Sequence, residues 1–565
     1  MSKATHTTAD ELRNWTNRRK FLSYLSAAPA LTAFAGAGLL SSPSAFAESG
    51  PIGPLDPRER RHRAFVIRRD AAIYQRDVPP TPSISNGDEE AYANRIASFS
   101  KGLPHNDLGE VDLNAYDVYL QALNSGKSAD FEAIPLGGAA KLSNPQAAYC
   151  YALEGADAAA LASPPAPAFN SAQIAGEMVE DYWQALTRDV PFTQYGTDPK
   201  IAQAVADLNN LSHYRGPKVN GQVTPDVIFR GLTPSDLTGP YMSQFMLKPV
   251  PMGAATLPQL YRTALAGDDY WTNYGDWLNG QRGGASGSNR PDPSPRYLRN
   301  GRDLAMYLLV DWSGQANVMA ALILNSFGTA ALAPSNPYLH SATQVANTTF
   351  GASSLVDLVT RVTNPALRAC WYQKWLVHRR LRPEAFGGRI HNHVTGAAKY
   401  PIHCDVLNSA ALQAVFSATG SYLLPMAYPT GSPLHPSYPA AHVVAAGAGI
   451  TVLKALFNES FVIPNPVMPS DDGLSLVPYT GEALTVGGEL NKLASNIAMG
   501  RDAGGVHYRS DGIEGIKLGE AIAISILRDA VTLYNEVFSG FSFTKYDGTP
   551  VTISANEGRA WSDSY

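Results

Sequence analysis

Apolar residues recur at the three- and four-residue spacing of amphipathic helices through long parts of this chain. The pattern predicts helices over residues 173–187, 302–326, 355–381, 440–458 and 512–538. One strand-like alternation, from Phe541 to Ile553 around Asp547-Gly548, predicts a β-hairpin. The Gly-, Ser- and Pro-rich residues 280–295 predict a surface loop. The patterning therefore indicates a mainly α-helical protein with a few small β-hairpins.

Composition limits the classes of function. The 565 residues are 45% hydrophobic, which is ample for a large core. A net charge of −5 gives no indication of a nucleic-acid partner. Only 16% of the residues are charged, which favours large surfaces buried between subunits. The three cysteines fit no metal-binding spacing and are interpreted as buried and unpaired; they are Cys150, Cys370 and Cys404.

The N-terminus has the features of an export signal. Paired arginines in T-N-R-R-K-F-L precede a mildly apolar run and a small-residue A-F-A sequence that ends at Ala47. This order predicts a twin-arginine signal peptide over residues 1–47, cleaved on export of the folded protein to the bacterial periplasm or the outside. An uncleaved membrane anchor is the alternative. Residues 48–90 are expected to form an extended arm, and residues 91–565 a single α-helical domain with no stable membrane insertion.

The first of three chemically unusual segments is K-W-L-V-H-R-R-L-R-P. Pro365 predicts a helix start and Pro383 a helix stop, so one helix of about four to five turns is expected. On that helix Lys374 and Arg382 would lie about 80° apart with His378 between them, so both cations could reach one point. The alternative is an ordinary basic helix surface.

The second segment is H-P-S-Y-P-A-A-H, from His435 to His442. Pro439 and the alanine-rich sequence after it predict a helix start. The free N–H groups of Ala440 and Ala441 and the positive end of the helix dipole would then face an anion, with His442 in the first turn. Two histidines that line a loop are the alternative.

The third segment places Arg501 six residues before His507 and Asp511 four residues after it. If a helix begins near His507, the Asp511 carboxylate can accept a proton from one ring nitrogen and leave the other as a lone-pair donor. The alternative is a surface histidine beside a helix-start aspartate. Together with Lys374 and Arg382, these segments predict a binding site for a phosphate-shaped oxyanion within residues 374–511.

Read in order, the three segments resemble the vanadium-dependent haloperoxidases and the wider superfamily that includes the type 2 phosphatidic acid phosphatases. The matching positions are Lys374, Arg382-Pro383, Pro439, His442, Arg501, His507 and Asp511. The flanks resemble the large algal-type bromoperoxidases, as in N-P-Q-A-A at 144, R-D-V-P-F at 188, P-S-D-D-G-L at 469 and G-E-L-N-K-L-A at 488. Because the phosphatases are usually much shorter, length and flanks favour the peroxidase branch, which implies its large helical-bundle fold.

The resemblance implies vanadate as cofactor, one per subunit, and leaves open a structural calcium ion. His507 resembles the axial ligand to the metal. Lys374, Arg382 and Arg501 resemble the cations that hydrogen-bond the equatorial oxygens. Ala441 would contribute its backbone N–H.

The resemblance also implies catalytic roles. His442 resembles the acid–base histidine, and Lys374 would polarise the bound oxygens. His435 resembles an additional histidine that is typical of bromide-type sites. Asp511 would orient His507 from behind.

The chain departs from the family where Ala440-Ala441 replaces Ser-Gly. The lost serine hydroxyl removes a hydrogen bond to a charged group, typically about 1.5–3 kcal/mol. At position 441 the backbone N–H is kept, but a positive φ would now cost energy.

The expected enzyme is a vanadate-dependent haloperoxidase that oxidises bromide or iodide with hydrogen peroxide to a hypohalous acid equivalent, which halogenates small organic substrates. Algal-type relatives imply a homo-oligomer. An acid phosphatase with His507 as nucleophile and His442 as proton donor is the main alternative. A third hypothesis is a non-halogenating or degenerate oxyanion-binding relative, which Ala440-Ala441 favours.

Overall fold

The computed structural model describes residues 56–284 and 287–554. The chain divides into two units, residues 1–69 and residues 70–565. The predicted signal peptide and the start of the predicted arm lie outside the described residues, as does the end of the chain after residue 554. None of the helices in the described part is long and apolar enough to cross a membrane.

The prediction of an extended arm is wrong for residues 57–77, which form helix α5 (Pro57–Asp77). Pro57 occupies the first helical position, and the Asp56 carboxylate accepts the N–H groups of Arg58 and Glu59. These are favourable start signals, and the alanines and arginines that follow have high helix propensity. The arginine- and proline-rich composition of this stretch suggested an arm. None of the residues of the helix is buried.

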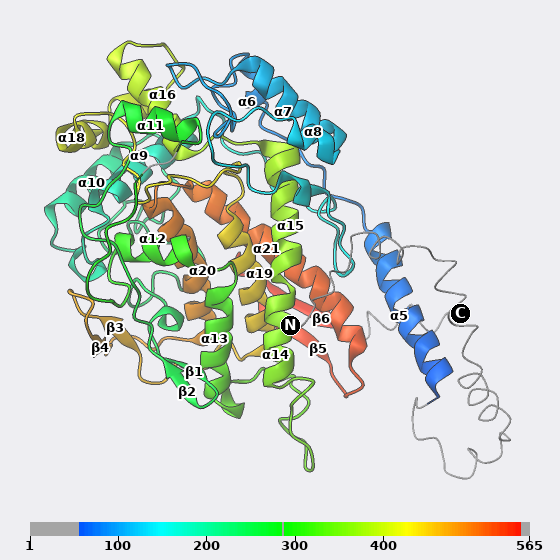
Figure 1. Cartoon of the computed structure of the whole chain (residues 1–565). Helices are drawn as coiled ribbons and strands as arrows, with labels where there is room; N and C mark the ends of the chain where they lie inside the picture. Colours follow the sequence, from blue (N-terminus) through cyan, green and yellow to red (C-terminus); the bar gives the residue numbers. More distant parts are fainter. Residues whose placement is uncertain (1–55, 285–286, 555–565) are drawn as a thin grey trace, which may run out of the picture. The chain divides into compact units, whose positions relative to one another are not determined.

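Four helices pack together in the centre of the second unit (Figure 1): α15 (Thr363–Tyr372), α19 (Ala441–Leu456), α20 (Val486–Ala503) and α21 (Arg509–Ala530). Helix α19 is mostly apolar and is buried at every residue except His442 and Leu456, as expected for a helix enclosed by others. Glycines allow α19 and α21 to approach closely: a Cβ atom on Gly519 would lie 2.1 Å from the Val444 carbonyl oxygen. This contact brings the second and third chemical segments together.

Other helices surround this centre. Next to it lie α12 (Gly301–Val310), α13 (Gln315–Ser326), α14 (Ala352–Arg361) and α9 (Ala172–Thr187). The remaining α-helices are α6 (Asp88–Ala91), α7 (Leu113–Ser125), α8 (Ser128–Glu132), α10 (Pro199–Asn210), α11 (Tyr274–Gln281), α16 (Pro383–Thr395), α17 (Cys404–Leu407) and α18 (Ala410–Thr419). The mainly helical prediction is confirmed.

The described strands form three antiparallel pairs: β1 (Val250–Met252) with β2 (Ala255–Leu257), β3 (Val467–Pro469) with β4 (Leu476–Pro478), and β5 (Gly540–Thr544) with β6 (Pro550–Ser554). In the last pair Phe541 lies opposite Ile553. The predicted C-terminal hairpin is therefore confirmed.

Two predicted long helices are interrupted. Residues 302–326 form α12 and α13, separated by a turn in which Gly314 has a φ of 104°. The predicted helix over residues 355–381 is α14, then α15, then a π-helix over Gln373–His378. The chain leaves that helix at Arg379, whose φ is 39°.

Arg382 therefore does not lie on the helix that carries Lys374. It is the N-cap of α16, and Pro383 is the first residue of that helix rather than a stop signal. The misreading has a physical reason: proline is excluded from a helix interior but is favourable at the first position, so the same residue can end one helix or begin another.

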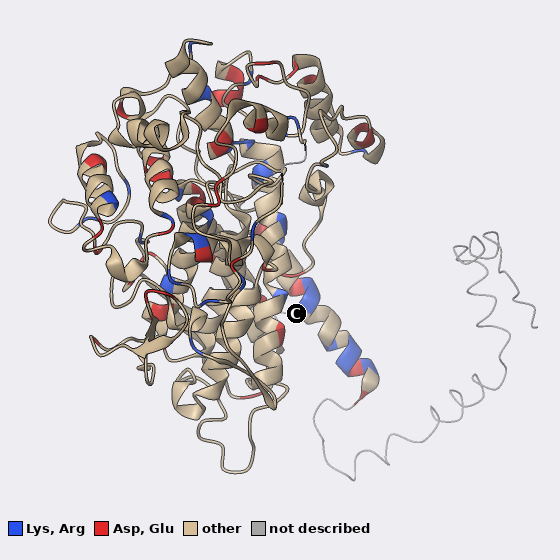
Figure 2. Cartoon of the chain, turned by 60° about the vertical axis from the view of Figure 1, so that its left-hand side comes forward, with Lys and Arg blue, Asp and Glu red and all other residues tan. Residues whose placement is uncertain are grey.

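Charged residues are sparse along the ribbon (Figure 2), in keeping with the 16% charged content. Many of those inside the second unit are buried in ion pairs, whereas the three buried cations of the candidate site described below have no carboxylate partner among the described residues. Among the cysteines, Cys370 is buried, whereas Cys150 and Cys404 are exposed; all three are free thiols. The expectation of unpaired cysteines is confirmed, and that of burial holds for Cys370 alone.

Candidate active site

Three cations reach the site from three different elements. Lys374, from the π-helix, is fully buried and donates to the carbonyl oxygens of Pro436 and Ser437, each at 2.6 Å. Arg382, at the start of α16, and Arg501, in the last turn of α20, are also buried. The π-helix adds a residue to the turn, and such turns are frequent at functional sites.

Arg382 holds the two histidines of the site together. Its Nε donates to the backbone oxygen of His435 at 2.9 Å, and its Nη2 lies 3.0 Å from Nδ1 of that ring. Its Nη1 lies 3.0 Å from Nε2 of His507 and donates to the Val506 carbonyl at 2.6 Å. One guanidinium group thus joins His435, which lies 53 positions after Arg382 in the chain, to His507, which lies 125 positions after it.

These cations lack carboxylate partners. Among the described residues, no carboxylate forms an ion pair with Lys374, Arg382 or Arg501, and the Nε of Arg501 is buried without a hydrogen-bond partner. The neighbouring Arg380 differs, because it pairs with Asp511 at 2.6 Å and Glu177 at 3.1 Å. The site therefore holds an excess of buried positive charge.

The excess charge perturbs the cations themselves. Burial, with repulsion from Arg382 and Arg501, lowers the pKa of Lys374 to about 7. Burial and repulsion from Arg501 likewise lower the pKa of Arg382 to about 10. Buried charges are stable when they are paired, so these groups require an anion. The donor set, three cations around one point, fits a compact oxyanion such as vanadate or phosphate.

His507 is prepared as a lone-pair donor. Its Nδ1 lies 2.8 Å from Oδ2 of Asp511, in the i,i+4 relation expected from the sequence. Asp511 is the third residue of α21 and also accepts the N–H of Tyr508 and the hydroxyl of Ser437. Burial tends to raise the pKa of Asp511, but Arg380, His507 and Ser437 outweigh it and hold that pKa well below its usual range.

The ionised Asp511 accepts a hydrogen bond from the Nδ1–H group of His507, so the ring proton stays on Nδ1. Burial and the adjacent Arg382 lower the pKa of His507 far below its ordinary value, so the ring is neutral. The Nε2 lone pair then faces the cation cluster. A neutral imidazole with a carboxylate behind it is the arrangement of both a metal ligand and a nucleophile.

His442 lies in the first turn of α19, as predicted, and is partly exposed. Its Nε2 lies 3.0 Å from Oδ1 of Asp311, the C-cap of α12. The same end of α12 also holds Arg501, whose Nη1 donates to the Leu308 carbonyl at 2.6 Å. Asp311 was not found from the sequence, since nothing in its local pattern distinguishes it from other helix-end aspartates.

His435 contacts an aromatic ring and a cation. Its ring centroid lies 5.0 Å from that of Trp371, and its Nδ1 lies 3.0 Å from Nη2 of Arg382. Burial, with Arg382 and Lys374, lowers the pKa of His435 far below its ordinary value. The imidazole is therefore neutral and can accept or donate a hydrogen bond without adding charge to the site.

The Ala440-Ala441 pair causes no backbone strain. Ala440 is the N-cap of α19 with a φ of −74°, and its N–H donates to the Asp511 carbonyl at 2.9 Å. Ala441 is not among the residues with positive φ. The expected conformational cost at position 441 is thus absent, and the N–H groups of the first turn of α19 lack intrahelical acceptors and suit an anion.

Some residues of the predicted segments make contacts that the sequence did not predict. The prediction that His378 lies between Lys374 and Arg382 on one helix is wrong, because Arg382 lies at the start of α16. Nε2 of His378 instead lies 3.2 Å from the Gln373 side chain. The alternative interpretation of the first segment, a basic helix surface, would expose Arg380 to solvent. Arg380 is instead buried and forms an ion pair with Asp511. Sequence reasoning also missed Ser437 and Glu177, which complete the hydrogen bonds around Asp511 and Arg380.

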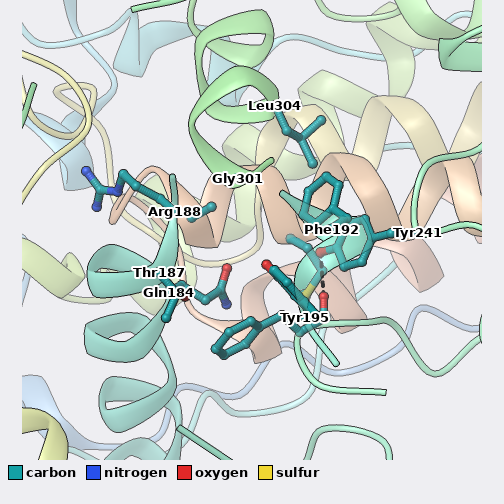
Figure 3. A pocket seen from close by; sticks show the side chains of 11 residues that line it. Gln184, Thr187, Arg188, Phe192, Tyr195, Tyr241, Gly301 and Leu304 are labelled. Atoms are coloured by element: carbon teal, nitrogen blue, oxygen red, sulfur yellow. Dashed lines mark hydrogen bonds between the residues drawn. The ribbon is translucent and has the colours of Figure 1, made fainter. Parts of the chain in front are cut away.

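A separate small cavity lies between α9, α12 and α20 (Figure 3). Gln184, Arg188, Tyr195 and Tyr241 are among its lining residues, and it has room for about one water molecule. It contains none of the predicted site residues and is too small for an organic substrate.

The chain is similar to known proteins over most of its length. A vanadium-dependent bromoperoxidase of Ascophyllum nodosum is 35% identical over 530 residues, which cover 88% of this chain and 93% of the relative. A vanadium-dependent bromoperoxidase of Corallina pilulifera is 33% identical over 599 residues, covering 88% of this chain and all of the relative. Residues 358–536 match the family model described as the VCPO second helical-bundle domain.

A solved structure has the same fold. The homohexameric second vanadate-dependent bromoperoxidase of Ascophyllum nodosum superposes with a TM-score of 0.84 at 32% identity, covering 89% of this chain and 91% of that one. The residues matched by the family model include all three cations and every histidine of the candidate site.

Proposed function

We propose that this chain, which belongs to the family of vanadium-dependent haloperoxidases, oxidises bromide in preference to chloride with hydrogen peroxide. Iodide is expected to serve as well. The product is a hypohalous acid equivalent that halogenates small organic molecules. The observation that carries the proposal is the excess of buried positive charge formed by Lys374, Arg382 and Arg501 around the lone pair of His507.

Different residues of the site would bind the oxygens and the metal of a vanadate ion. The three cations would hydrogen-bond and neutralise the oxygens of a vanadate ion, and the Ala441 N–H would add a donor at the start of α19. Nε2 of His507 would be the ligand to the metal. Asp511 keeps the proton on Nδ1, so that Nε2 stays available.

The remaining residues manage protons and the halide. Bound vanadate supplies Lewis-acid activation of hydrogen peroxide without a change in oxidation state. His442, oriented by Asp311, takes the proton that peroxide must lose and returns one to the leaving oxygen. Lys374 would draw electron density from an oxyanion bound beside it, and the neutral His435 would contact the incoming halide.

The same site could bind phosphate, with His507 attacking phosphorus and His442 protonating the leaving alcohol. The two activities respond oppositely to vanadate. The test is bromination of a phenol dye by purified protein with peroxide and bromide, before and after incubation with orthovanadate, beside hydrolysis of p-nitrophenyl phosphate. Vanadate-dependent bromination supports the proposal; phosphate release that vanadate inhibits would replace it with a phosphatase.

Export and assembly are further parts of the proposal. The paired arginines and A-F-A sequence of the first 47 residues favour twin-arginine export to the periplasm or the outside. The low charged content and the homohexameric relative favour a homo-oligomer. Fractionation of the native host and light scattering of the purified protein test the two points.

A further inference from the structure

A buried ion pair lies beside the candidate active site without belonging to any of its sequence motifs. Lys101 Nζ lies 2.9 Å from Oε1 of Glu384, and both side chains are almost completely buried. Glu384 is in the first turn of α16, two residues after Arg382. The Lys101 ammonium also lies 4.4 Å from the centroid of the Trp271 ring, a cation–π distance.

Both members of the pair hold the backbone of one loop. Lys101 Nζ donates to the carbonyl oxygens of Thr430, at 2.9 Å, and Ser432, at 2.5 Å. Glu384 Oε2 accepts the N–H of Ser432 at 2.5 Å. Both hydrogen bonds of the ammonium group thus end on this loop, and its ion pair is with Glu384.

The loop packs closely against Trp271 and Glu384. Gly431 has a φ of 58°, and a Cβ atom there would lie 2.3 Å from the Trp271 ring and 2.6 Å from Glu384 Oε2. The Trp271 Nε1 donates to the Pro429 carbonyl at 3.1 Å. The backbone of residues 429–432 is thus hydrogen-bonded by the side chains of Trp271, Lys101 and Glu384.

This loop leads directly to His435, three residues after Ser432. The Leu434 carbonyl accepts the N–H of Ser143 at 2.9 Å, and the His435 carbonyl accepts Arg382 Nε, also at 2.9 Å. The start of α16 therefore holds the loop at two points, through Glu384 at Ser432 and through Arg382 at His435. A displacement of the backbone at Ser432 would therefore also displace His435, which follows three residues later.

We propose that Lys101 and Glu384 are positioning residues that set His435 against the oxyanion site and so control the halide step. The inference rests on the proposed function. A buried ion pair is not by itself evidence of stabilisation, because its desolvation can offset its attraction. What distinguishes this pair is that its hydrogen bonds end on the backbone of the loop that carries His435.

The chain contains a matched control. Lys492 and Glu489 form a buried pair at 2.5 Å, and Glu489 accepts the N–H of Gln244 at 2.7 Å. The residue types, the burial and the carboxylate-to-backbone hydrogen bond are the same. None of the hydrogen bonds of this second pair ends on residues 429–435.

The experiment compares Lys101→Met, Lys101→Arg and Glu384→Gln with Lys492→Met and Glu489→Gln. We expect Lys101→Met to raise the KM for bromide about tenfold, while the Kd for orthovanadate changes by less than about twofold. Lys101→Arg, which keeps the charge, should recover part of the loss. Lys492→Met and Glu489→Gln should keep the wild-type KM for bromide.

A second measurement does not depend on activity. Crystal structures of the vanadate-free wild type and Lys101→Met should show His435 displaced in the variant, together with residues 430–434. If Lys101→Met does not fold, the KM for bromide and the position of His435 are measured on Glu384→Gln, which keeps the shape of the side chain. An unmoved His435 with an unchanged bromide KM overturns the proposal, as does an equal rise of KM in Lys492→Met. Absence of vanadate-dependent bromination in the wild type overturns the proposed function instead.

Discussion

Nε2 of His442 lies 3.0 Å from Oδ1 of Asp311, a residue 131 positions earlier in the chain. The hydrogen bond occupies one ring nitrogen and leaves the other for proton exchange. A carboxylate in this position orients the imidazole ring and fixes the tautomer.

We expect Asp311→Asn to lower kcat for bromination about 10- to 100-fold, with little change in orthovanadate affinity. Steady-state kinetics of bromination and titration with orthovanadate measure the two quantities. The control is Asp405→Asn, since Asp405 lies beside His403 in another His–Asp pair, with 3.7 Å between Nδ1 and the carboxylate. A kcat for Asp311→Asn equal to that of this control would contradict the assignment.

Ala440→Ser should improve the site. The added hydroxyl at the N-cap of α19 can donate to a bound oxyanion, which we expect to tighten orthovanadate binding by about tenfold or more. Ala441→Gly should have little effect on affinity, because the backbone at that position does not need a positive φ. Titration of both variants with orthovanadate gives the comparison. Equal affinities for Ala440→Ser and the wild type would mean that the hydroxyl does not reach the anion.

Oxyanion binding should take up protons above pH 7. The pKa of Lys374 is lowered to about 7 in the folded protein, chiefly by burial. An anion beside the ammonium raises that pKa, so at pH 8 binding restores a proton that the free site has lost. Apparent affinity therefore falls as the pH rises above 7.

Calorimetric titration with tungstate, an oxyanion that carries no proton in this range, measures the uptake in two buffers of different ionisation enthalpy. Lys374→Gln should bind more weakly and lose most of the uptake. Equal heats in the two buffers for the wild type at pH 8 would exclude this linkage.

Asp511 should contribute to stability as well as to the site. Its pKa is lower in the folded protein than in the unfolded chain, so its contribution is fully present above about pH 4 and declines as the pH falls towards the folded pKa. We expect Asp511→Asn to lower the free energy of unfolding at pH 7 by about 3 kcal/mol, because Arg380 loses a buried partner. Urea unfolding at pH 7 and pH 3 checks the size and the pH trend. A difference between variant and wild type that grows on acidification would contradict the sign.

Much of the site could be predicted from local sequence. The His507–Asp511 hydrogen bond follows from a spacing of four residues at a helix start, and the placement of His442 follows from proline before an alanine-rich helix. The helical fold and the C-terminal hairpin follow from periodicity and turn residues. These features depend on neighbours within about one helical turn, where backbone geometry alone decides which side chains can meet.

Tertiary structure decided the rest. Whether Pro383 ended a helix or began one, and so how Arg382 reached His507, depended on packing against residues more than a hundred positions away. The partner of His442, the burial of Arg380 and the Lys101–Glu384 pair are likewise contacts between distant segments. The sequence by itself determined which chemical groups the site contains, because residue types and short spacings are local. Only the folded chain determined which groups stay unpaired, because partners for buried charges come from wherever the packing of the core places them.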